Sequence, residues 1–254
     1  MPRATSALAH VEEASSGQFA ASGDAAFSGA RLLPNPHNVP SDVTIWRLEH
    51  SGDNSAGPAC TSLTSEDWKE LSLLRGEARS RSFRVRAFLR VALSAAVDGS
   101  IDPGAWRFER SIYGKPLLAA GHEGPQFTIS HSGNTSFVAI STMRRVGLDI
   151  AQRAVHDWHE VAVQLFTSAE RSMINAARPA EREATFLRIW TAKEAFAKLI
   201  GAGLALHAPA NDCGFGTRLA SWIVGSPSGD LQISLAFDDL IDRQELALGM
   251  KQTK

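Results

Sequence analysis

The segment Thr167-Ser-Ala-Glu170 has the pattern of a capping box, in which a threonine hydroxyl and an acidic side chain three residues later satisfy main-chain N–H groups at a helix start. Thr64-Ser-Glu-Asp67, which stands 103 positions earlier, also combines an N-cap hydroxyl with acids in the first turn. The two segments therefore predict two helix starts of similar local design, one in each half of the chain.

The same shift of 103 positions, taken without a gap, aligns other residues of the two halves. It places Val43 on Val146, Arg79 on Arg182, Phe83 on Phe186 and Ala92 on Ala195. A strand, a capped helix and a long helix stay in register under this shift, so we predict a pseudo-duplicated α+β protein. Each half is expected to pack an antiparallel sheet on a long helix, with a ligand site in the cleft between the halves.

Hydrophobic periodicity and turn residues predict the individual elements. Strands are expected at 43–48, 106–108, 127–130, 136–141 and 146–150, with strand-like pattern at 231–234 and 245–250. Helices are expected from Thr64, over 77–97, from Thr167, and from Pro179 to near Gly201 and Gly203. This organisation predicts an N-terminal subdomain of residues 41–145 and a C-terminal subdomain of residues 146–254.

The first forty residues differ from the rest because they are dense in Ala, Ser, Gly and Pro and have no steady apolar period. We predict that residues 1–40 form a mobile tail that contributes little to the core. The tail lacks the apolar stretch of a signal peptide, and no part of the chain has a run long enough to span a bilayer. Cys60 and Cys213 follow no metal or redox spacing, so we expect a cytoplasmic protein.

The 254 residues carry a formal net charge of -1, which argues against a globally basic nucleic-acid binder. Six arginines nevertheless gather in one short stretch, at positions 75, 79, 81, 84, 86 and 90. A solvated helix face explains such a stretch in most proteins. The alternative is a binding site for phosphates or for an acidic partner.

Two acidic residues stand where the other half of the repeat has apolar ones. Asp149 aligns with Trp46, and Glu194 aligns with Val91. A carboxylate flanked by apolar strand residues is costly to bury alone, so Asp149 needs either a salt bridge or hydrogen bonds, or else binds a hard cation. Glu194 shares a helical stripe with Trp190 and Lys198; Glu-to-Lys at this spacing is also a common surface pair, but the tryptophan indicates a half-buried face.

Two further segments carry polar side chains at turns. Phe127-Thr-Ile-Ser-His-Ser132 ends a predicted strand with two hydroxyls and an imidazole, and neighbouring strand residues point to opposite faces. Gly114-Lys115-Pro116 is a rigid turn that presents one ammonium group. Each segment is weak evidence when it is taken alone.

Taken in order, these segments resemble the larger, pseudodimeric (Sfp-type) 4'-phosphopantetheinyl transferases. The resemblance extends from Arg75 to Leu204: an arginine-rich helix, Gly-Lys-Pro, Ser-His-Ser, Gly-x-Asp, and Trp-x-x-Lys-Glu-Ala-x-x-Lys followed by Gly-x-Gly-Leu. It implies an enzyme that transfers the phosphopantetheine arm of coenzyme A to a serine of a carrier protein. Magnesium would be the cofactor, with manganese as a second possibility, and adenosine 3',5'-bisphosphate the by-product.

The resemblance also implies roles for particular residues. Asp149 and Glu194 match the magnesium ligands, and Glu194 matches the base that acts on the carrier serine. Lys198 matches the lysine that protonates or neutralises the leaving group. The remaining matches are contacts of coenzyme A, namely His131, Ser130, Lys115, Arg75 and Arg81.

One position departs from the family. Many members have a second acid two residues after the strand aspartate, but Ala151 stands there in this chain. We predict that a water takes the missing place, which leaves the preference between magnesium and manganese open. The partner is expected to be an apo acyl or peptidyl carrier protein of fatty acid, polyketide or nonribosomal peptide synthesis, with secondary metabolism favoured by analogy. The enzyme is expected to act as a monomer, without nucleic acid or membrane.

Three alternatives have less support. A coenzyme A- or carrier-binding paralogue with weakened catalysis is suggested by Ala151, although Glu194 and Lys198 are both present. An arginine-rich module for nucleic acid or acidic proteins lacks the interleaved aromatic residues of a base-stacking surface. An ordinary hydrolase lacks a nucleophile elbow, a paired-histidine zinc motif and a phosphate-binding glycine loop.

Overall fold

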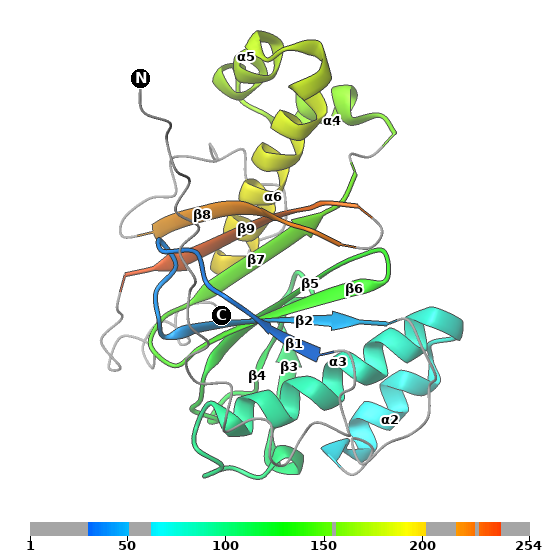
Figure 1. Ribbon diagram of the computed structural model, residues 1–254. Coiled ribbons are helices and arrows are strands. Elements are labelled where there is room, and N and C mark those ends of the chain that lie inside the picture. The colour runs from blue at the N-terminus through cyan, green and yellow to red at the C-terminus, as the bar shows by residue number, and fades with distance from the viewer. Residues whose placement is uncertain (1–29, 51–61, 154–155, 202–216, 227–228, 240–254) are drawn as a thin grey trace, which may run out of the picture.

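The structure is a computed structural model that describes residues 30–50, 62–153, 156–201, 217–226 and 229–239. Two antiparallel sheets lie one above the other, and each has a long helix on its outer side (Figure 1). Two further helices, at the end of the second long helix, stand away from the sheets (Figure 1). Among the described residues, no helix is long and apolar enough to cross a membrane.

The first half contains a four-stranded sheet, two helices and a small two-stranded sheet. The four-stranded sheet has the order β1-β2-β6-β5, and all its neighbours are antiparallel. The elements are β1 (Ala30–Leu33), β2 (Val43–Glu49), α2 (Ser65–Ser72), α3 (Gly76–Ala95), the short helix η2 (Pro103–Ala105), β3 (Phe108–Arg110), β4 (Pro116–Leu118), β5 (Gln126–Ser132) and β6 (Thr135–Ser141).

The second half contains a three-stranded antiparallel sheet in the order β7-β9-β8. Helix α6 packs on β7 and β9, and α5 packs on α6. The elements are β7 (Val146–Ala151), α4 (Trp158–Leu165), α5 (Ser168–Ala176), η3 (Pro179–Glu181), α6 (Arg182–Ile200), β8 (Thr217–Val224) and β9 (Leu231–Asp238).

The two halves follow the same plan. The capped helix α2 and the long helix α3 follow β2, and the capped helix α5 and the long helix α6 follow β7 and α4. The last strand of each half lies in the middle of its sheet, as β6 does in β2-β6-β5 and β9 in β7-β9-β8. Both predicted helix starts form, and each is a complete capping box, which the sequence predicted only for Thr167. Each box also holds a buried cation from its long helix: Arg90 reaches Asp67, and Lys193 reaches Glu170. These four residues obey the 103-position shift.

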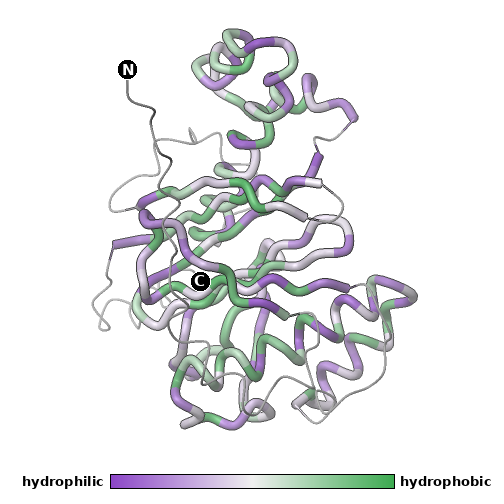
Figure 2. Tube along the Cα trace, viewed as in Figure 1, coloured by the Kyte–Doolittle hydropathy of each residue, from purple (hydrophilic) through white to green (hydrophobic). Residues whose placement is uncertain are grey.

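Each half has its own apolar core. In the first half, α3 packs its apolar face, including Phe88 and Leu93, on one face of the sheet. The other face of that sheet, through Ile45 and Phe137, packs against the second sheet. Figure 2 shows hydrophobic residues along these strands and a mixed pattern along the helices. Every strand in the middle of a sheet is thus covered on both faces. The two halves meet along an edge strand of each sheet, and this contact is called the seam below.

At that seam, β5 lies against β7, and each is the edge strand of its own sheet. Side-chain hydroxyls of β5 accept hydrogen bonds from main-chain N–H groups of β7 and of Gln152, the residue after it. These bonds satisfy donors at the sheet edge that a neighbouring strand would otherwise bind. The three bonds are Leu148 N to Thr128 Oγ1 (3.4 Å), Ile150 N to Ser130 Oγ (3.3 Å) and Gln152 N to Ser132 Oγ (3.3 Å).

Gly147 sets how closely α6 approaches β7. A Cβ at this position would lie 2.0 Å from the main-chain oxygen of Ala195 and 2.4 Å from the main-chain nitrogen of Leu199. No side chain fits there without moving the helix backbone. The glycine of the Gly-x-Asp segment therefore allows α6, which carries Glu194 and Lys198, to cross directly over the strand that carries Asp149.

Some sequence predictions were wrong in detail. Residues 30–40 belong to the fold, because Ala30–Leu33 form β1 on the edge of the first sheet and Val39 lies in the core. The strand predicted at 106–108 begins only at Phe108, since Trp106 is fully buried after a short helix and donates to Ser94. The sequence did not predict β4, α4 or β8.

Other predictions fall outside the described residues. These are the mobility of residues 1–29, the strand-like segment 245–250, the helix-ending role of Gly203, and both cysteines. Gly201 does end α6, with the left-handed conformation (φ 71°) that glycine adopts without a Cβ clash.

Candidate active site

The centre of the candidate site is a triangle of three side chains from three elements. Lys198 Nζ, on the last turn of α6, lies 2.7 Å from Asp149 Oδ1 on β7. Ser130, on β5, donates to the same carboxylate oxygen at 2.8 Å and accepts from Lys198 Nζ at 3.0 Å. Asp149 is 7% exposed, so its charge is balanced inside the protein rather than by water. The triangle joins the two halves.

Glu194 is half-buried and lies one helical turn before Lys198 on α6. The pKa of its carboxyl group is raised to about 7, mainly by burial and also by the nearby Asp149 carboxylate, while the Lys198 ammonium opposes both effects. The mutual repulsion shows that the two carboxylates, which are 45 positions apart in sequence, lie in one electrostatic environment. The structure thus brings together Asp149, Glu194, Lys198 and Ser130.

This pair of carboxylates fits a hard divalent cation. Magnesium takes oxygen ligands and uses one or two protein carboxylates, with phosphate and water at the other positions. The buried Asp149 carboxylate and the half-buried Glu194 carboxylate provide such oxygens, and a cation between them would relieve their repulsion. Among the described residues, no group of three His, Cys, Asp or Glu side chains is placed to hold a metal, which agrees with Ala151 in place of a third acid.

Lys115 connects the first half to the C-terminal end of α6. Its Nζ donates a hydrogen bond to the main-chain oxygen of Lys198. The pKa of Lys115 is lowered to about 8, mainly by burial and also by the nearby cations Arg145 and Lys198, while Asp238 opposes them. The Gly-Lys-Pro turn therefore presents its ammonium at the seam, beside the triangle.

His131 follows Ser130 on β5 but points to the opposite face of the strand, toward α3. Burial lowers the pKa of its imidazole, Arg81 and Lys198 lower it further, and Asp149 opposes them. The predicted Ser-His pair is therefore divided: Ser130 faces the acids of the second half, whereas His131 lies near Arg81. Two neighbouring residues contribute to two sides of one site.

The arginine-rich helix α3 uses several of its cations for internal contacts. Arg90 is buried and pairs with Asp67 at 2.6 Å, and Arg86 pairs with Asp67 at 3.0 Å. Arg84 donates to the main-chain oxygen of Glu49 at 3.1 Å. Arg81 is the cation of this helix that acts on His131. Arg84, Arg86 and Arg90 therefore serve contacts within the fold, whereas Arg81 lies near enough to His131 to affect its pKa.

Arg75 stands apart from the other predicted residues. It is the exposed N-cap of α3, six residues before Arg81, which corresponds to about 9 Å along a helix. Its side chain makes no capping hydrogen bond. The structure therefore places Arg75 at the exposed start of α3, where it makes none of the contacts that join the other predicted residues described above.

Sequence reasoning missed two features of this site. The direct bond from Ser130 to Asp149 depends on β5 lying beside β7, and the sequence predicts each strand but not their contact. The crossing of α6 over Gly147 was also missed. Its available signal was the glycine itself, since a glycine inside an apolar strand often marks a close backbone approach.

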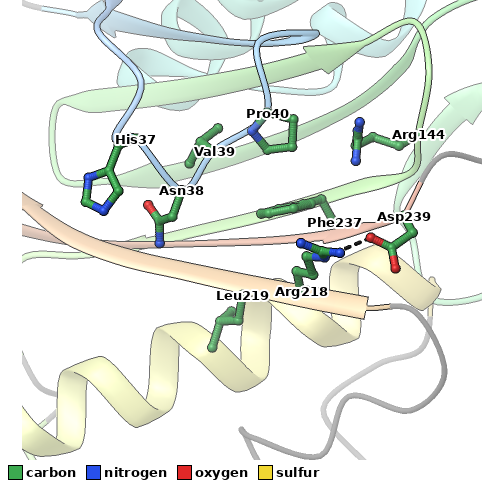
Figure 3. Close-up of a pocket in the computed structure, with 9 residues that line it drawn as sticks. All are labelled: His37, Asn38, Val39, Pro40, Arg144, Arg218, Leu219, Phe237 and Asp239. Atoms are coloured by element: carbon green, nitrogen blue, oxygen red, sulfur yellow. Dashed lines mark ion pairs between the residues drawn. The ribbon is translucent and has the colours of Figure 1, made fainter.

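A separate open pocket lies near the other end of these strands. It has a volume of about 710 Å³ and contains none of the predicted site residues. Figure 3 shows Arg218 and Asp239 on one side, paired at 2.8 Å, and Arg144 on another. The remaining lining residues are His37, Asn38, Val39, Pro40, Leu219 and Phe237.

Comparison of the sequence with known proteins indicates a class of enzyme. Residues 145–223, which include Gly147, Asp149, Glu194 and Lys198, match the sequence model of the 4'-phosphopantetheinyl transferase superfamily. The matched segment contains β7 and α6 and thus the crossing at Gly147.

Relatives with this activity in their names extend the likeness. The chain is 26% identical over 181 residues to the 4'-phosphopantetheinyl transferase HetI of Nostoc sp., covering 68% of this chain and 76% of that protein. It is 31% identical over 116 residues to a Bacillus subtilis 4'-phosphopantetheinyl transferase, with 46% and 50% covered. It is 40% identical over 90 residues to AcpT of Salmonella typhimurium, with 35% and 46% covered.

These matches support the predicted enzyme class: residues 145–223 fit the superfamily model, and several curated relatives of this chain are named 4'-phosphopantetheinyl transferases. The chain spans about three quarters of the Nostoc protein and about half of the other two.

Proposed function

We propose that this protein transfers the 4'-phosphopantetheine group of coenzyme A to a serine of an apo carrier protein and releases adenosine 3',5'-bisphosphate. The observation that carries the proposal is the meeting of Asp149, Lys198 and Ser130 at the seam, with the Glu194 carboxylate close by. Such a mixture of acids and a cation suits phosphoryl transfer, in which charge has to be stabilised and a proton moved.

Asp149 and Glu194 would hold a divalent cation, with magnesium proposed before manganese. When bound, this ion supplies positive charge to the pyrophosphate of coenzyme A. Ser130 contributes by fixing the Asp149 carboxylate, because it donates to one of its oxygens and leaves the other free of that bond. Near Ala151, we propose that a water takes the ligand position that an acidic side chain fills in other members of the family.

The transfer forms one oxygen–phosphorus bond and breaks another. The carrier serine oxygen attacks the β-phosphorus of coenzyme A, and Glu194 accepts the serine proton directly or through water. The bond from this phosphorus to the bridging oxygen breaks, and its electron pair leaves with adenosine 3',5'-bisphosphate. Lys198 gives a proton to that leaving phosphate or neutralises its charge, since its ammonium already lies at the Asp149 carboxylate.

Cations around the seam would bind coenzyme A. Lys115 presents its ammonium beside the C-terminal end of α6, within the region where the pyrophosphate must lie. His131 and Arg81 form a second group toward α3, and Arg75 lies at the exposed start of that helix. In the proposed division, residues 41–145 supply coenzyme A contacts and residues 146–254 supply the metal and proton-transfer groups.

The partner is proposed to be an acyl or peptidyl carrier protein of fatty acid, polyketide or nonribosomal peptide synthesis. One chain supplies both sides of the seam, so we propose a monomeric enzyme that works in the cytoplasm. Because Arg84, Arg86 and Arg90 are engaged within the fold, α3 is a poorer candidate for a nucleic-acid surface.

A second candidate function is binding of coenzyme A or carrier protein with weakened catalysis. Ala151 favours it, because the position offers no carboxylate to a metal. The presence of Glu194 and Lys198 in one stripe beside Asp149 favours the active enzyme instead.

The two candidates are separated by incubating the protein with coenzyme A, magnesium and an apo carrier protein, and measuring the intact mass of the carrier. The active enzyme adds the phosphopantetheine arm, whereas the binding paralogue leaves the mass unchanged. Glu194→Gln and Lys198→Ala are each expected to lower turnover by orders of magnitude while the protein still folds. A Lys198→Ala variant as active as the parent would overturn the role of that lysine.

A further inference from the structure

Three hydroxyl side chains form a hydrogen-bonded line beneath α6 that the proposed function does not use. Oγ1 of Thr191, on α6, lies 2.8 Å from Oγ of Ser234 on β9, which in turn lies 2.8 Å from Oγ of Ser221 on β8. Thr191 and Ser234 are both 0% exposed, whereas Ser221 is exposed. The line therefore runs from the surface of β8 to the inner side of the helix that carries Glu194 and Lys198.

The hydrogen-bond directions in this line follow from the number of protons. Each hydroxyl has one proton to donate. Thr191 donates to the main-chain oxygen of Leu187, 2.9 Å away in the preceding turn of α6. All the bonds form together when Ser234 donates to Thr191 and Ser221 donates to Ser234. Thr191 is thus the acceptor on which the buried Ser234 hydroxyl depends, since a buried donor without an acceptor is costly.

The same row of the second sheet contains Asp149. Ser234 is the Cα partner of Asp149 on one side and of Ser221 on the other. Residues directly opposite each other in antiparallel strands extend to the same face of the sheet. Thr191 contacts Ser234 and Lys198 contacts Asp149, so this is the face that α6 covers. One row of the sheet therefore holds both the acid of the site and the hydroxyl that binds α6.

Close to the site, α6 packs on this face through small and apolar residues. Ala195 and Leu199 of α6 pack with Ala236 of β9, and Gly147 of β7 is the Cα partner of Ala236. Apolar contacts are not directional, so they hold a helix against a sheet without fixing its place along the sheet. A hydrogen bond between two short side chains requires a particular distance and angle. The bond between α6 and β9 therefore fixes the position of the helix.

Thr191 lies on the same stripe of α6 as the site residues. It precedes Glu194 by three positions and Lys198 by seven, which correspond to about one and two helical turns. A shift of Thr191 over Ser234 would therefore displace Glu194 and Lys198 relative to Asp149. A displacement of about 1 Å is enough to lower the rate of a reaction between positioned groups by up to about a hundredfold.

A hydroxyl at position 191 is not required by the repeat. The shift of 103 positions places Thr191 on Phe88, a buried apolar residue of α3. Replacing both partners of a buried hydrogen bond by apolar groups of the same shape is often nearly neutral for stability. The polar pair is therefore expected to serve the position of the helix more than the stability of the fold.

We propose that Thr191 and Ser234 are positioning residues of the active site. Their hydrogen bond holds α6 at the place on the sheet where Glu194 and Lys198 meet Asp149. They act through the helix and not on the substrate. The proposal rests on the proposed function, because it concerns how that site is kept in its reactive geometry.

The test separates position from stability with a double-mutant cycle. Thr191→Val removes a hydroxyl with little change of shape and leaves the Ser234 donor without its acceptor. Ser234→Ala removes the donor, and the double variant removes both partners. Thr191→Ser keeps the hydroxyl and is the conservative rescue. Ser221→Ala removes only the exposed hydroxyl of the line and is the matched control. Urea unfolding gives the stability of each protein, and steady-state carrier modification gives kcat and the KM for coenzyme A.

Thr191→Val should lower the urea midpoint, and adding Ser234→Ala should recover most of that loss, because no buried donor is then left unpaired. The double variant should nevertheless keep a kcat about tenfold below that of the parent, with a KM for coenzyme A within about twofold. Thr191→Ser and Ser221→Ala should each keep kcat within about twofold of the parent, since both retain the bond between α6 and β9.

A double variant with parental kcat would overturn the positioning role and leave the proposed function intact. Additive stability effects of the two single substitutions would also overturn it, because they would show that the two hydroxyls do not bond. If the double variant does not fold, Thr191→Val and Thr191→Ser decide, and equal kcat values in these two overturn the proposal. A parent that transfers no phosphopantetheine to an apo carrier protein would instead overturn the proposed function, and the positioning role with it.

Discussion

Ser130 Oγ, on the edge strand of the first sheet, lies 2.8 Å from Asp149 Oδ1 on the edge strand of the second. This contact joins the two halves at the point where the proposed chemistry takes place. It also gives the Ser-His-Ser segment a physical role, since the first serine orients an acid of the other half. The two neighbouring hydroxyls, of Thr128 and Ser132, accept hydrogen bonds from the main-chain N–H groups of Leu148 and Gln152.

Ser130→Ala is therefore expected to lower kcat for carrier modification by about tenfold, because Asp149 loses the bond that fixes its carboxylate. The magnesium concentration needed for half-maximal kcat should also rise, since the carboxylate would bind the ion less tightly. Ser132→Ala removes a comparable hydroxyl from the same strand and should keep near-parental kcat. Steady-state kinetics at several magnesium concentrations measure both. Equal effects of the two substitutions would show that the hydroxyls matter only for joining the strands.

Gly147→Ala should destabilise the protein by at least about 3 kcal/mol, because the added Cβ would overlap the α6 backbone and force a shift. The free energy of unfolding in urea measures this effect. Gly225→Ala is the matched control, since a Cβ at that position meets nothing within 4 Å. A Gly147→Ala variant as stable as the control would mean that α6 does not cross β7 this closely.

Lys193→Met should cost about 3 kcal/mol of stability, because it leaves the buried Glu170 carboxylate without the ammonium that lies 3.1 Å away. Denaturant unfolding again provides the measurement. Arg178→Ala, which removes an exposed ion pair with Glu181, should leave the unfolding midpoint unchanged. If both substitutions have the same small effect, the capped helix does not depend on this buried ion pair.

His50 should make the fold sensitive to mild acid. Burial and the nearby arginines lower its pKa in the folded protein to about 4, below the 6.5 of the unfolded chain. The unfolded state thus binds an extra proton between these values, so stability is full above pH 6.5 and falls as the pH drops toward 4. The loss attributable to this ring is about 2 kcal/mol, reduced from the full shift because the ring is only partly buried.

His50→Gln removes the titrating ring and should therefore lose less stability than the parent between pH 7 and pH 4.5. Urea unfolding of both proteins at the two pH values gives the difference. His122→Gln, at an exposed turn, corrects for the general effect of removing a histidine. Parallel pH profiles for parent and His50→Gln would contradict the buried, neutral state of this ring.

The parts of the fold that the sequence predicted well are those with strong local signals. Both capped helix starts are local hydrogen-bond patterns, and the strands that begin at Val43 and Val146 are β-branched and apolar, so tertiary contacts do not overrule them. The shift of 103 positions also linked residues whose shared role appears only in three dimensions, such as Arg90 and Lys193.

The features that escaped prediction depend on distant contacts. β1 has a short, half-exposed sequence and exists because it pairs with β2. Helix α4 is eight residues long and packs its apolar side on α6, which its own sequence does not specify. At the site, the motif predicted which residues take part. It did not predict that Ser130 faces the second half and His131 faces α3, because this depends on which element covers each face of β5.

The central claim is that Asp149 and Glu194 hold one divalent ion between the two halves. Manganese binding, followed by electron paramagnetic resonance in the presence of coenzyme A, tests it most directly with the parent, Asp149→Asn and Glu194→Gln. We predict one site in the parent and at least about tenfold weaker binding in each variant, because each loses a ligand of the same ion. Parental manganese affinity in both variants would contradict the claim.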